Sequence, residues 1–177
     1  MLCIADVYYY YLDDIQHANK FYEMYELYTD EPTTSERFKH LMYVYLIQGN
    51  KEGAKRCAEL FMIGLQKKYE FNPAQSVEEQ YVNSVYVRKK NLFDMAVYWL
   101  CYDNIEKARE YCNRMKICNF CDNCMMKGCT DYYELVGLLY EIEGDTKKAL
   151  DYYQKSAQVD KDNYVVRWKV EKGKATS

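Results

Sequence analysis

Glycine and proline are scarce in this sequence, with 7 and 2 residues among 177. The turns of β-rich folds depend on both residues, so their scarcity argues against a sandwich or a barrel. The longest apolar run, Ala96–Tyr102, is much shorter than the ~20 residues that a membrane-spanning helix needs. The acidic residues Asp6, Asp13 and Asp14 interrupt the start of the chain, so no secretory signal is expected there. The composition therefore predicts a helical, cytoplasmic protein without a membrane span.

Strong positive charge and the common catalytic motifs are also missing. The formal net charge is −3, which argues against non-specific binding to nucleic acid. The sequence contains no glycine-rich phosphate loop, no G-x-S-x-G elbow and no H-E-x-x-H helix. Its carboxylate pairs, such as Asp13-Asp14 and Glu78-Glu79, occur at expected turns or helix starts, where helix capping explains them. We therefore expect neither an enzyme nor a nucleic-acid-binding protein.

Tyrosine, by contrast, is abundant, with 21 residues. Most tyrosines recur with other apolar residues at spacings of three and four, which is typical of helices that bury one stripe. We expect these rings to pack between helices, with their hydroxyl groups reaching the surface. Turn and capping residues between the stripes predict helical hairpins at residues 1–29, 34–70, 76–117 (with an extra helix) and 130–163, followed by a C-terminal cap and tail at 164–177.

Local signals predict further details of these elements. Ser76 and Glu79 have the spacing of a capping box and should open a helix. We expect a break near Lys89-Lys90-Asn91, after which the repeat pattern restarts. In the last segment, Val165 and Trp168 should pack inward, and the polar tail from Lys169 should be frayed.

The segment 130–163 has the clearest hairpin pattern. Its first helix should end at Gly144-Asp145, because glycine suits the left-handed position after a helix and aspartate caps the next helix. Gly137 lies inside the first helix, where glycine costs about 1 kcal/mol relative to alanine. A glycine at this position predicts that another helix approaches closely.

This segment resembles a tetratricopeptide repeat, a 34-residue unit of two helices. The residues that match the family pattern are Tyr133, Val136-Gly137 and Tyr140 on the first helix, with Ala149, Tyr153 and Ser156 on the second. Lys161 stands where the family usually has proline. The resemblance implies an all-α fold, an α-α superhelix of about four hairpins, with residues 1–177 as a single domain and a cysteine loop at 118–129 between the third and fourth hairpins.

The resemblance also implies a concave groove lined by the first helix of each hairpin. The positions that correspond to this groove are Val7, Tyr10, Tyr11, Lys39, Tyr43, Leu46, Phe93, Val97, Leu100, Glu134, Leu138 and Glu141. Most are aromatic or apolar, so an open groove should accept an apolar or helical segment of a partner protein. If the extra helix or the C-terminal tail closes the groove, the same residues belong to the core.

Four cysteines, Cys118, Cys121, Cys124 and Cys129, have the spacing C-x2-C-x2-C-x4-C. Two-residue spacers let a tight turn direct two thiolates toward one ion, and four thiolates complete a closed, structural Zn²⁺ site. An iron–sulfur cluster and redox-active or simply free thiols remain as alternatives. Cys112 lies shortly before the loop and is an alternative ligand.

These observations favour a non-catalytic adaptor or scaffold of the tetratricopeptide type that binds a protein or a peptide and contains a structural zinc site. The alternative is a metal- or redox-responsive regulatory protein that uses the cysteine loop, and an iron–sulfur protein is a third reading. The chain could also pair with a second copy through an exposed end repeat, so a homo-oligomer is one of the expected states.

Overall fold

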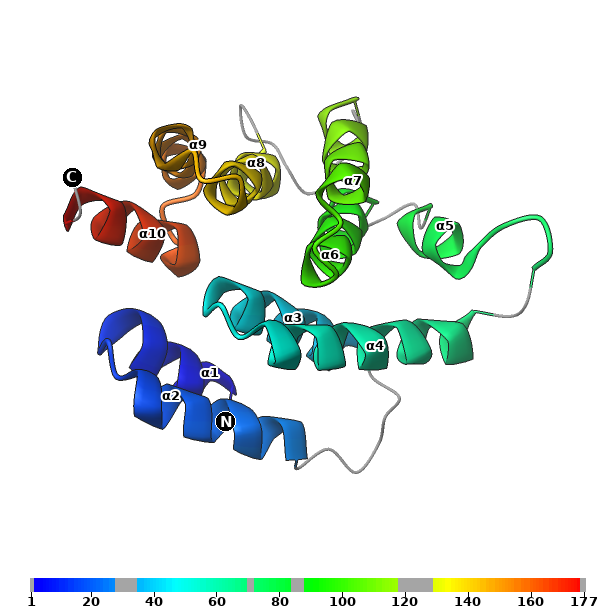
Figure 1. The fold of residues 1–177 in the computed structure, drawn as a ribbon, viewed down its shortest axis with the longest axis horizontal. Helices are drawn as coiled ribbons and strands as arrows, with labels where there is room; N and C mark the ends of the chain where they lie inside the picture. Colours follow the sequence, from blue (N-terminus) through cyan, green and yellow to red (C-terminus); the bar gives the residue numbers. More distant parts are fainter. Residues whose placement is uncertain (1, 28–34, 70–71, 84–87, 118–128, 176–177) are drawn as a thin grey trace. The chain divides into compact units, whose positions relative to one another are not determined.

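The chain folds into helices throughout the part that can be described (Figure 1). The computed structural model describes residues 2–27, 35–69, 72–83, 88–117 and 129–175, and every regular element within them is a helix. The all-α prediction is therefore confirmed. The chain divides into two compact units, Met1–Thr34 and Ser35–Ser177. The expectation of one repeat domain over residues 1–177 stays a prediction.

The first unit contains three consecutive elements: α1 (Leu2–Asp6), a π-helical turn η1 (Val7–Tyr11) and α2 (Ile15–Leu27). The chain reverses at Asp13, which has a left-handed φ of 53°. The Asp14 side chain then accepts a hydrogen bond from the His17 amide in the first turn of α2. Inside the unit, the Tyr22 hydroxyl donates to the Asp6 carboxylate at 2.6 Å, which joins α2 to α1.

The second unit contains the remaining helices. Three pairs of consecutive helices pack together: α3 with α4, α6 with α7, and α8 with α9. The last helix, α10, packs on α9. Their bounds are α3 (Ser35–Ile47), α4 (Lys51–Lys68), α5 (Val77–Val82), α6 (Arg88–Cys101), α7 (Ile105–Ile117), α8 (Thr130–Ile142), α9 (Thr146–Val159) and α10 (Tyr164–Ala175).

Turns between paired helices follow from local chemistry. Gly49 and Gly144 adopt left-handed φ values of 73° and 85°, which glycine reaches without steric cost. The side chains of Asn50 and Asp145 then accept hydrogen bonds from backbone amides three residues ahead. The turn predicted at Gly144-Asp145 is thus confirmed, and both helix pairs reverse within a few residues.

The break before α6 lies earlier than expected. Helix α5 ends at Val82 and α6 begins at Arg88, so the residues Lys89-Lys90-Asn91 belong to the first turns of α6. The Asn91 side chain donates a 2.7 Å hydrogen bond to the carbonyl of Tyr81 in the last turn of α5, which ties the start of α6 to α5. This contact between two helices forms with Asn91 inside α6, and no local feature of the sequence indicates that α6 begins before Asn91.

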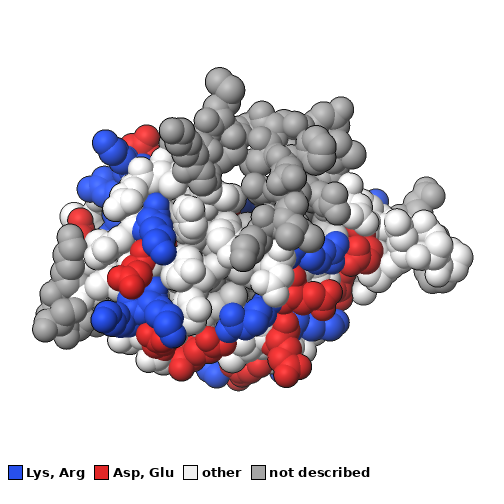
Figure 2. All heavy atoms as spheres, turned by 90° about the horizontal axis from the view of Figure 1, so that it is seen from above, with Lys and Arg blue, Asp and Glu red and all other residues white. Residues whose placement is uncertain are grey.

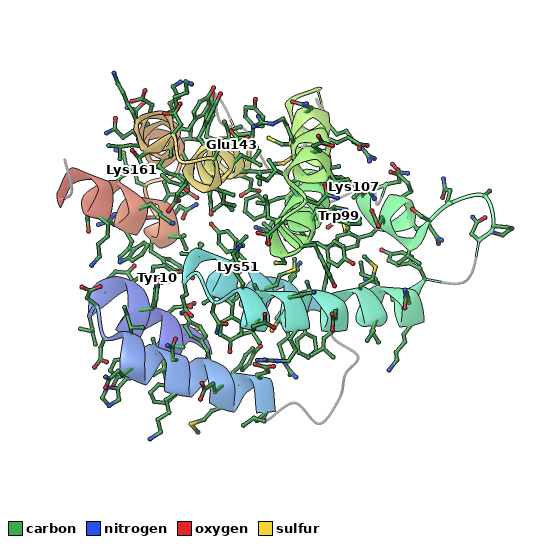
Figure 3. The ribbon with its side chains drawn as sticks, viewed as in Figure 1. Tyr10, Lys51, Trp99, Lys107, Glu143 and Lys161 are labelled. Carbon is green, nitrogen blue, oxygen red and sulfur yellow. The ribbon has the colours of Figure 1, made fainter. Side chains whose placement is uncertain are left out.

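Short helix α5 is attached to α6 and α7 by its two adjacent glutamates. Glu78 accepts hydrogen bonds from the Tyr111 hydroxyl at 2.7 Å and from the Trp99 indole at 3.3 Å. Glu79 pairs with both terminal nitrogens of Arg114, at 2.8 and 3.1 Å. The Lys107 ammonium lies 3.8 Å from the centre of the Trp99 ring, and Figure 3 shows the two side chains side by side. These contacts hold α5 against the α6–α7 pair.

Five tyrosine hydroxyls donate to a carboxylate on another helix, and the pairs are Tyr22 with Asp6, Tyr43 with Glu134, Tyr81 with Asp94, Tyr111 with Glu78 and Tyr153 with Glu141. The hydrogen bonds of Tyr22 and Tyr81 are buried, so the expectation that the hydroxyls reach the surface is wrong for these two residues, and the other three bonds are partly buried. Sequence periodicity locates the rings but not the distant acids that accept their hydrogen bonds.

The C-terminal segment is more regular than expected. Helix α10 continues to Ala175, so the tail from Lys169 is helical over most of its length. Val166 is fully buried and packs with Ala149 and Tyr153 of α9, whereas Val165 and Trp168, the residues expected to pack inward, are only half-buried. Among the helices of the described ranges, none combines the length and apolar character needed to cross a bilayer.

The close approach predicted at Gly137 is present. A Cβ atom added to Gly137 would lie 2.6 Å from Cε1 and 2.7 Å from Cδ1 of the Tyr153 ring in α9. Real Cβ atoms do not approach a ring this closely, so α8 and α9 can pack at this distance only with glycine at the crossing.

We expect Gly137→Ala to lower the free energy of unfolding by about 1–3 kcal/mol, the usual cost of overpacking a core. The loss should occur although alanine favours a helix by about 1 kcal/mol relative to glycine. The Tyr153 ring cannot move aside freely, because its hydroxyl donates to Glu141. Urea unfolding followed by circular dichroism measures the change.

Gly173→Ala in α10 is the matched control. Its added Cβ would lie 3.0 Å from Cδ1 of Leu150, the end of a flexible side chain that can shift. This variant should be as stable as the native protein or more stable. A Gly137→Ala protein at least as stable as the native one would contradict the close-packing argument.

Candidate functional site

The structure brings together the predicted groove positions of the second unit. Helix α6 packs against both α3 and α8, the helices that carry the other two sets of groove positions. The Tyr43 ring of α3 meets the Phe93 ring of α6 edge to face, with ring centroids 5.5 Å apart. Tyr43 also donates a hydrogen bond to Glu134 of α8. Residues of three hairpins, far apart in the sequence, thus meet on one side of the unit.

Most of the apolar groove positions are buried. Phe93, Val97, Leu100 and Leu138 expose 1–4% of their surface, whereas Leu46, Lys39, Tyr43 and Glu141 are half-buried. The remaining positions, Val7, Tyr10 and Tyr11, lie in the first unit, where Tyr10 is buried and Val7 and Tyr11 are exposed. The buried groove positions of α6 and α8, which are Phe93, Val97, Leu100 and Leu138, therefore serve as packing residues of the second unit.

Glu134 is the most deeply buried carboxylate among these positions, with 5% of its surface exposed. It accepts hydrogen bonds from the Tyr43 hydroxyl and, at 2.8 Å, from the side-chain amide of Asn163 in the α9–α10 turn. Burial raises the pKa of Glu134 above its ordinary value, and the two hydrogen bonds and the charge of Lys90 lower it only in part. Glu134 therefore links α8 to α3 and to the turn before α10.

A second buried carboxylate, Asp94 of α6, lies in the same region. It accepts a 2.7 Å hydrogen bond from the Tyr81 hydroxyl, and the Lys39 ammonium lies 3.5 Å away. The Lys90 ammonium lies 4.6 Å from the centre of the Phe93 ring. These polar groups have partners that neutralise or hydrogen-bond them, which is what keeps buried charges tolerable. The arrangement can fix the relative positions of α3, α5, α6 and α8.

The cysteine loop lies mostly outside the described residues. This applies to Cys118, Cys121 and Cys124, whereas Cys129 is half-buried and directly precedes the first turn of α8. A helix N-terminus favours a thiolate, so the position of Cys129 suits a metal ligand. Cys112 is 3% exposed, and burial raises the pKa of its thiol to about 11, which disfavours it as a ligand. Within the described ranges, no three His, Cys, Asp or Glu side chains converge on a possible metal position.

A cavity of about 610 Å³ lies against α9 and α10, and we call it the C-terminal cavity. Its apolar wall includes Ile47, Leu150 and Trp168. The charged side chains that line it are Lys147, Lys169, Lys172 and Glu141. Three lysines against one glutamate give the cavity a positive character.

Lys169 lines this cavity and is itself held in place. Only 9% of its side chain is exposed, and its ammonium lies 2.7 and 2.8 Å from the two carboxylate oxygens of Glu141. Glu141 also accepts a hydrogen bond from the Tyr153 hydroxyl. Because Glu141 neutralises Lys169, the net positive charge comes from Lys147 and Lys172.

Sequence reasoning identified two residues of this cavity, Glu141 as a groove position and Trp168 as an inward-packing residue, but it expected the segment from Lys169 to be frayed and so missed the rest of the α10 wall. A signal was present, because Val166 and Val170 are four positions apart and both pack with the Ala149–Tyr153 cluster. Extending the helical period through the apparently polar tail would have indicated that α10 continues past Lys169.

Comparison with protein-family models, with curated proteins and with solved structures finds no match. On the face that Figure 2 shows, the basic and acidic side chains of the described residues are interspersed.

We expect Glu134→Gln to remove a pH dependence of stability. The folded pKa of Glu134 lies above the ordinary value of 4.5, so the native protein keeps a proton that the unfolded chain has released. The stability due to this proton is lost as the pH rises from the unfolded to the folded pKa. The free energy of unfolding of the native protein should therefore fall relative to that of Glu134→Gln as the pH is raised above about 4.5.

Urea unfolding at a series of pH values measures this difference. Glu110→Gln, an exposed glutamate on α7, is the matched control, and its curve should run parallel to that of the native protein. The free energy of unfolding of the native protein minus that of Glu134→Gln should fall as the pH rises. If this difference stays constant or grows with pH, the pKa of Glu134 in the folded protein is not raised.

Proposed function

We propose that this protein is a non-catalytic adaptor of the tetratricopeptide type that binds a short segment of a partner protein. The scaffold in this proposal is a solenoid of about four helical hairpins. Consecutive pairing of α3 with α4, α6 with α7 and α8 with α9 supports it, as does the resemblance of residues 130–163 to one repeat. The close crossing at Gly137 is what the family pattern requires of that repeat.

The observation that carries the binding proposal is the C-terminal cavity. Its volume of about 610 Å³ lies within the range of roughly 300–1,000 Å³ typical of ligand pockets. An apolar wall beside excess positive charge suits a peptide segment that presents a large apolar side chain next to an aspartate or glutamate. The apolar groove positions of α6 and α8 are buried. Our proposal therefore assigns the bound segment to the cavity rather than to those positions.

A structural zinc ion is the second part of the proposal. Cys118, Cys121, Cys124 and Cys129 would hold it, and the bound ion would tie the cysteine loop to the first turn of α8. The ion supplies no chemistry beyond this cross-link, because four thiolates leave no open position. Buried thiols such as Cys101 and Cys112 fit a reducing compartment, so we propose a cytoplasmic location.

The peptide proposal predicts a defined ligand composition and charge dependence. Selection from a phage-displayed library of short random peptides should enrich sequences that combine a large apolar residue with an acidic one. Lys147→Glu together with Lys172→Glu should weaken binding of such a peptide by about 10-fold or more, because two attractive charges become repulsive. Fluorescence polarisation at low and high salt measures the change.

Lys161→Glu makes the same type of charge change outside the cavity, at the α9–α10 connection (Figure 3). It should leave binding within about twofold of the native value. If Lys161→Glu lost as much affinity for the peptide as the cavity variant, binding would depend on the overall charge of the protein and not on the cavity. Failure to enrich acidic-apolar peptides would refute the cavity as the binding site.

The zinc proposal predicts one zinc ion per chain by elemental analysis of untagged protein purified without oxygen. Cys121→Ser and Cys124→Ser should lose the metal and lower the melting temperature, because metal-binding free energy contributes to folding free energy. Cys3→Ser, which changes an exposed thiol, should keep both.

Other outcomes of the metal analysis distinguish the alternatives. Iron with a brown absorption band would identify an iron–sulfur protein. Protein without metal whose loop thiols oxidise readily would support the metal- or redox-responsive alternative and refute structural zinc.

A further inference from the structure

One ion pair belongs to the lining of the C-terminal cavity. The Lys169 ammonium lies 2.7 and 2.8 Å from the two carboxylate oxygens of Glu141, and both residues line the cavity. The Lys169 side chain is 9% exposed, whereas that of Glu141 is 39% exposed. The carboxylate is thus open to the cavity, and its charge acts on a bound ligand as well as on Lys169.

The lining of the cavity has an inner and an outer part. Ala149 and Tyr153 are buried, and together with Lys169 they form the inner part. The exposed lysines Lys147 and Lys172 belong to the outer part. Because Glu141 balances the one positive charge of the inner part, the excess positive charge of the cavity lies in the outer part.

Glu141 is held in place by two other helices. Its carboxylate accepts hydrogen bonds from the Tyr153 hydroxyl of α9 and from the Lys169 ammonium of α10. The Lys169 ammonium also lies 5.9 Å from the centre of the Tyr153 ring and 5.7 Å from that of the Trp168 ring. These contacts fix the ion pair before a ligand arrives, so an entering acidic group meets the carboxylate and the ammonium together.

We propose that Glu141 determines the specificity of the C-terminal cavity. It restricts the ligand to one acidic side chain, bound at Lys147 and Lys172, and it selects an uncharged side chain for the place beside Lys169. Without the charge of Glu141, Lys169 would be a third attractive lysine and the cavity would accept a second acid. The carboxylate therefore acts by repelling ligands that carry an acid at this place. This inference rests on the proposed peptide-binding function.

Fluorescence polarisation with two kinds of peptide tests the proposal. The one-acid probe is a library-enriched peptide with a single acidic residue. The two-acid probes are the same peptide with each uncharged residue replaced in turn by aspartate. For each protein variant, the dissociation constant of every two-acid probe is divided by that of the one-acid probe. Both probes meet the same folded fraction of the protein, so this ratio is independent of any loss of stability.

Glu141→Gln removes the charge and keeps a side-chain oxygen that can accept hydrogen bonds. For at least one position of the second acid, its ratio should be at least about fivefold lower than that of the native protein, because the ammonium of Lys169 then attracts that acid. Lys169→Gln should raise the ratio at the same position. Glu141→Gln together with Lys169→Gln should restore the native ratio, since both side chains are then neutral.

Glu143→Gln is the matched control. Glu143 lies two residues from Glu141 and pairs with Arg109 of α7, and it is not part of the cavity lining (Figure 3). This variant should keep the native ratio at every position of the second acid. A fall as large as that of Glu141→Gln would assign the effect to overall charge and overturn the proposal.

The results separate this proposal from the peptide-binding function. If the native protein binds the one-acid probe and Glu141→Gln has the native ratio at every position, Glu141 only holds α8 to α9 and α10. The specificity proposal is then wrong, and the peptide-binding function stands. If the native protein binds no enriched peptide, the peptide-binding function is refuted and the specificity proposal with it.

Discussion

Hydrogen bonds from tyrosine hydroxyls to carboxylates on other helices connect the described helices within each unit. Taking a carboxylate out of water costs several kcal/mol unless a donor compensates it, so the buried acids Asp6, Asp94 and Glu134 depend on their tyrosine partners. Burial and the nearby carboxylates raise the pKa of Tyr153 and of Tyr111, which keeps both hydroxyls protonated and able to donate. The high tyrosine content therefore supplies both ring packing and the donors that make buried acids tolerable.

Helix α8 contributes two carboxylates to this network in the second unit. Glu134 joins it to Tyr43 of α3 and to Asn163 in the α9–α10 turn, and Glu141, two helical turns later, joins it to Tyr153 of α9 and Lys169 of α10. Gly137 lies between the two glutamates and admits the Tyr153 ring. The position of α10, and with it the wall of the C-terminal cavity, depends on these contacts.

The two units expose different kinds of surface. In the second unit, the apolar positions of α6 and α8 are used for packing, and the C-terminal cavity has mixed apolar and positive character. In the first unit, the exposed side chains of α1 and η1 include the apolar residues Ile4, Val7, Tyr11 and Leu12.

Local chemistry in the sequence by itself determined the helical class and the paired turns. A cap or a left-handed glycine acts within about four residues, as at Gly49-Asn50 and Gly144-Asp145, so it can be read without the fold. Only the tertiary structure decided where α6 begins, how far α10 extends, and which acid each tyrosine meets. Tyr43 and Glu134, for example, are 91 residues apart, and no spacing rule relates them. The candidate cavity depends on such long-range pairs, because they place α10 against α8 and α9, and sequence periodicity cannot specify which helix packs against which.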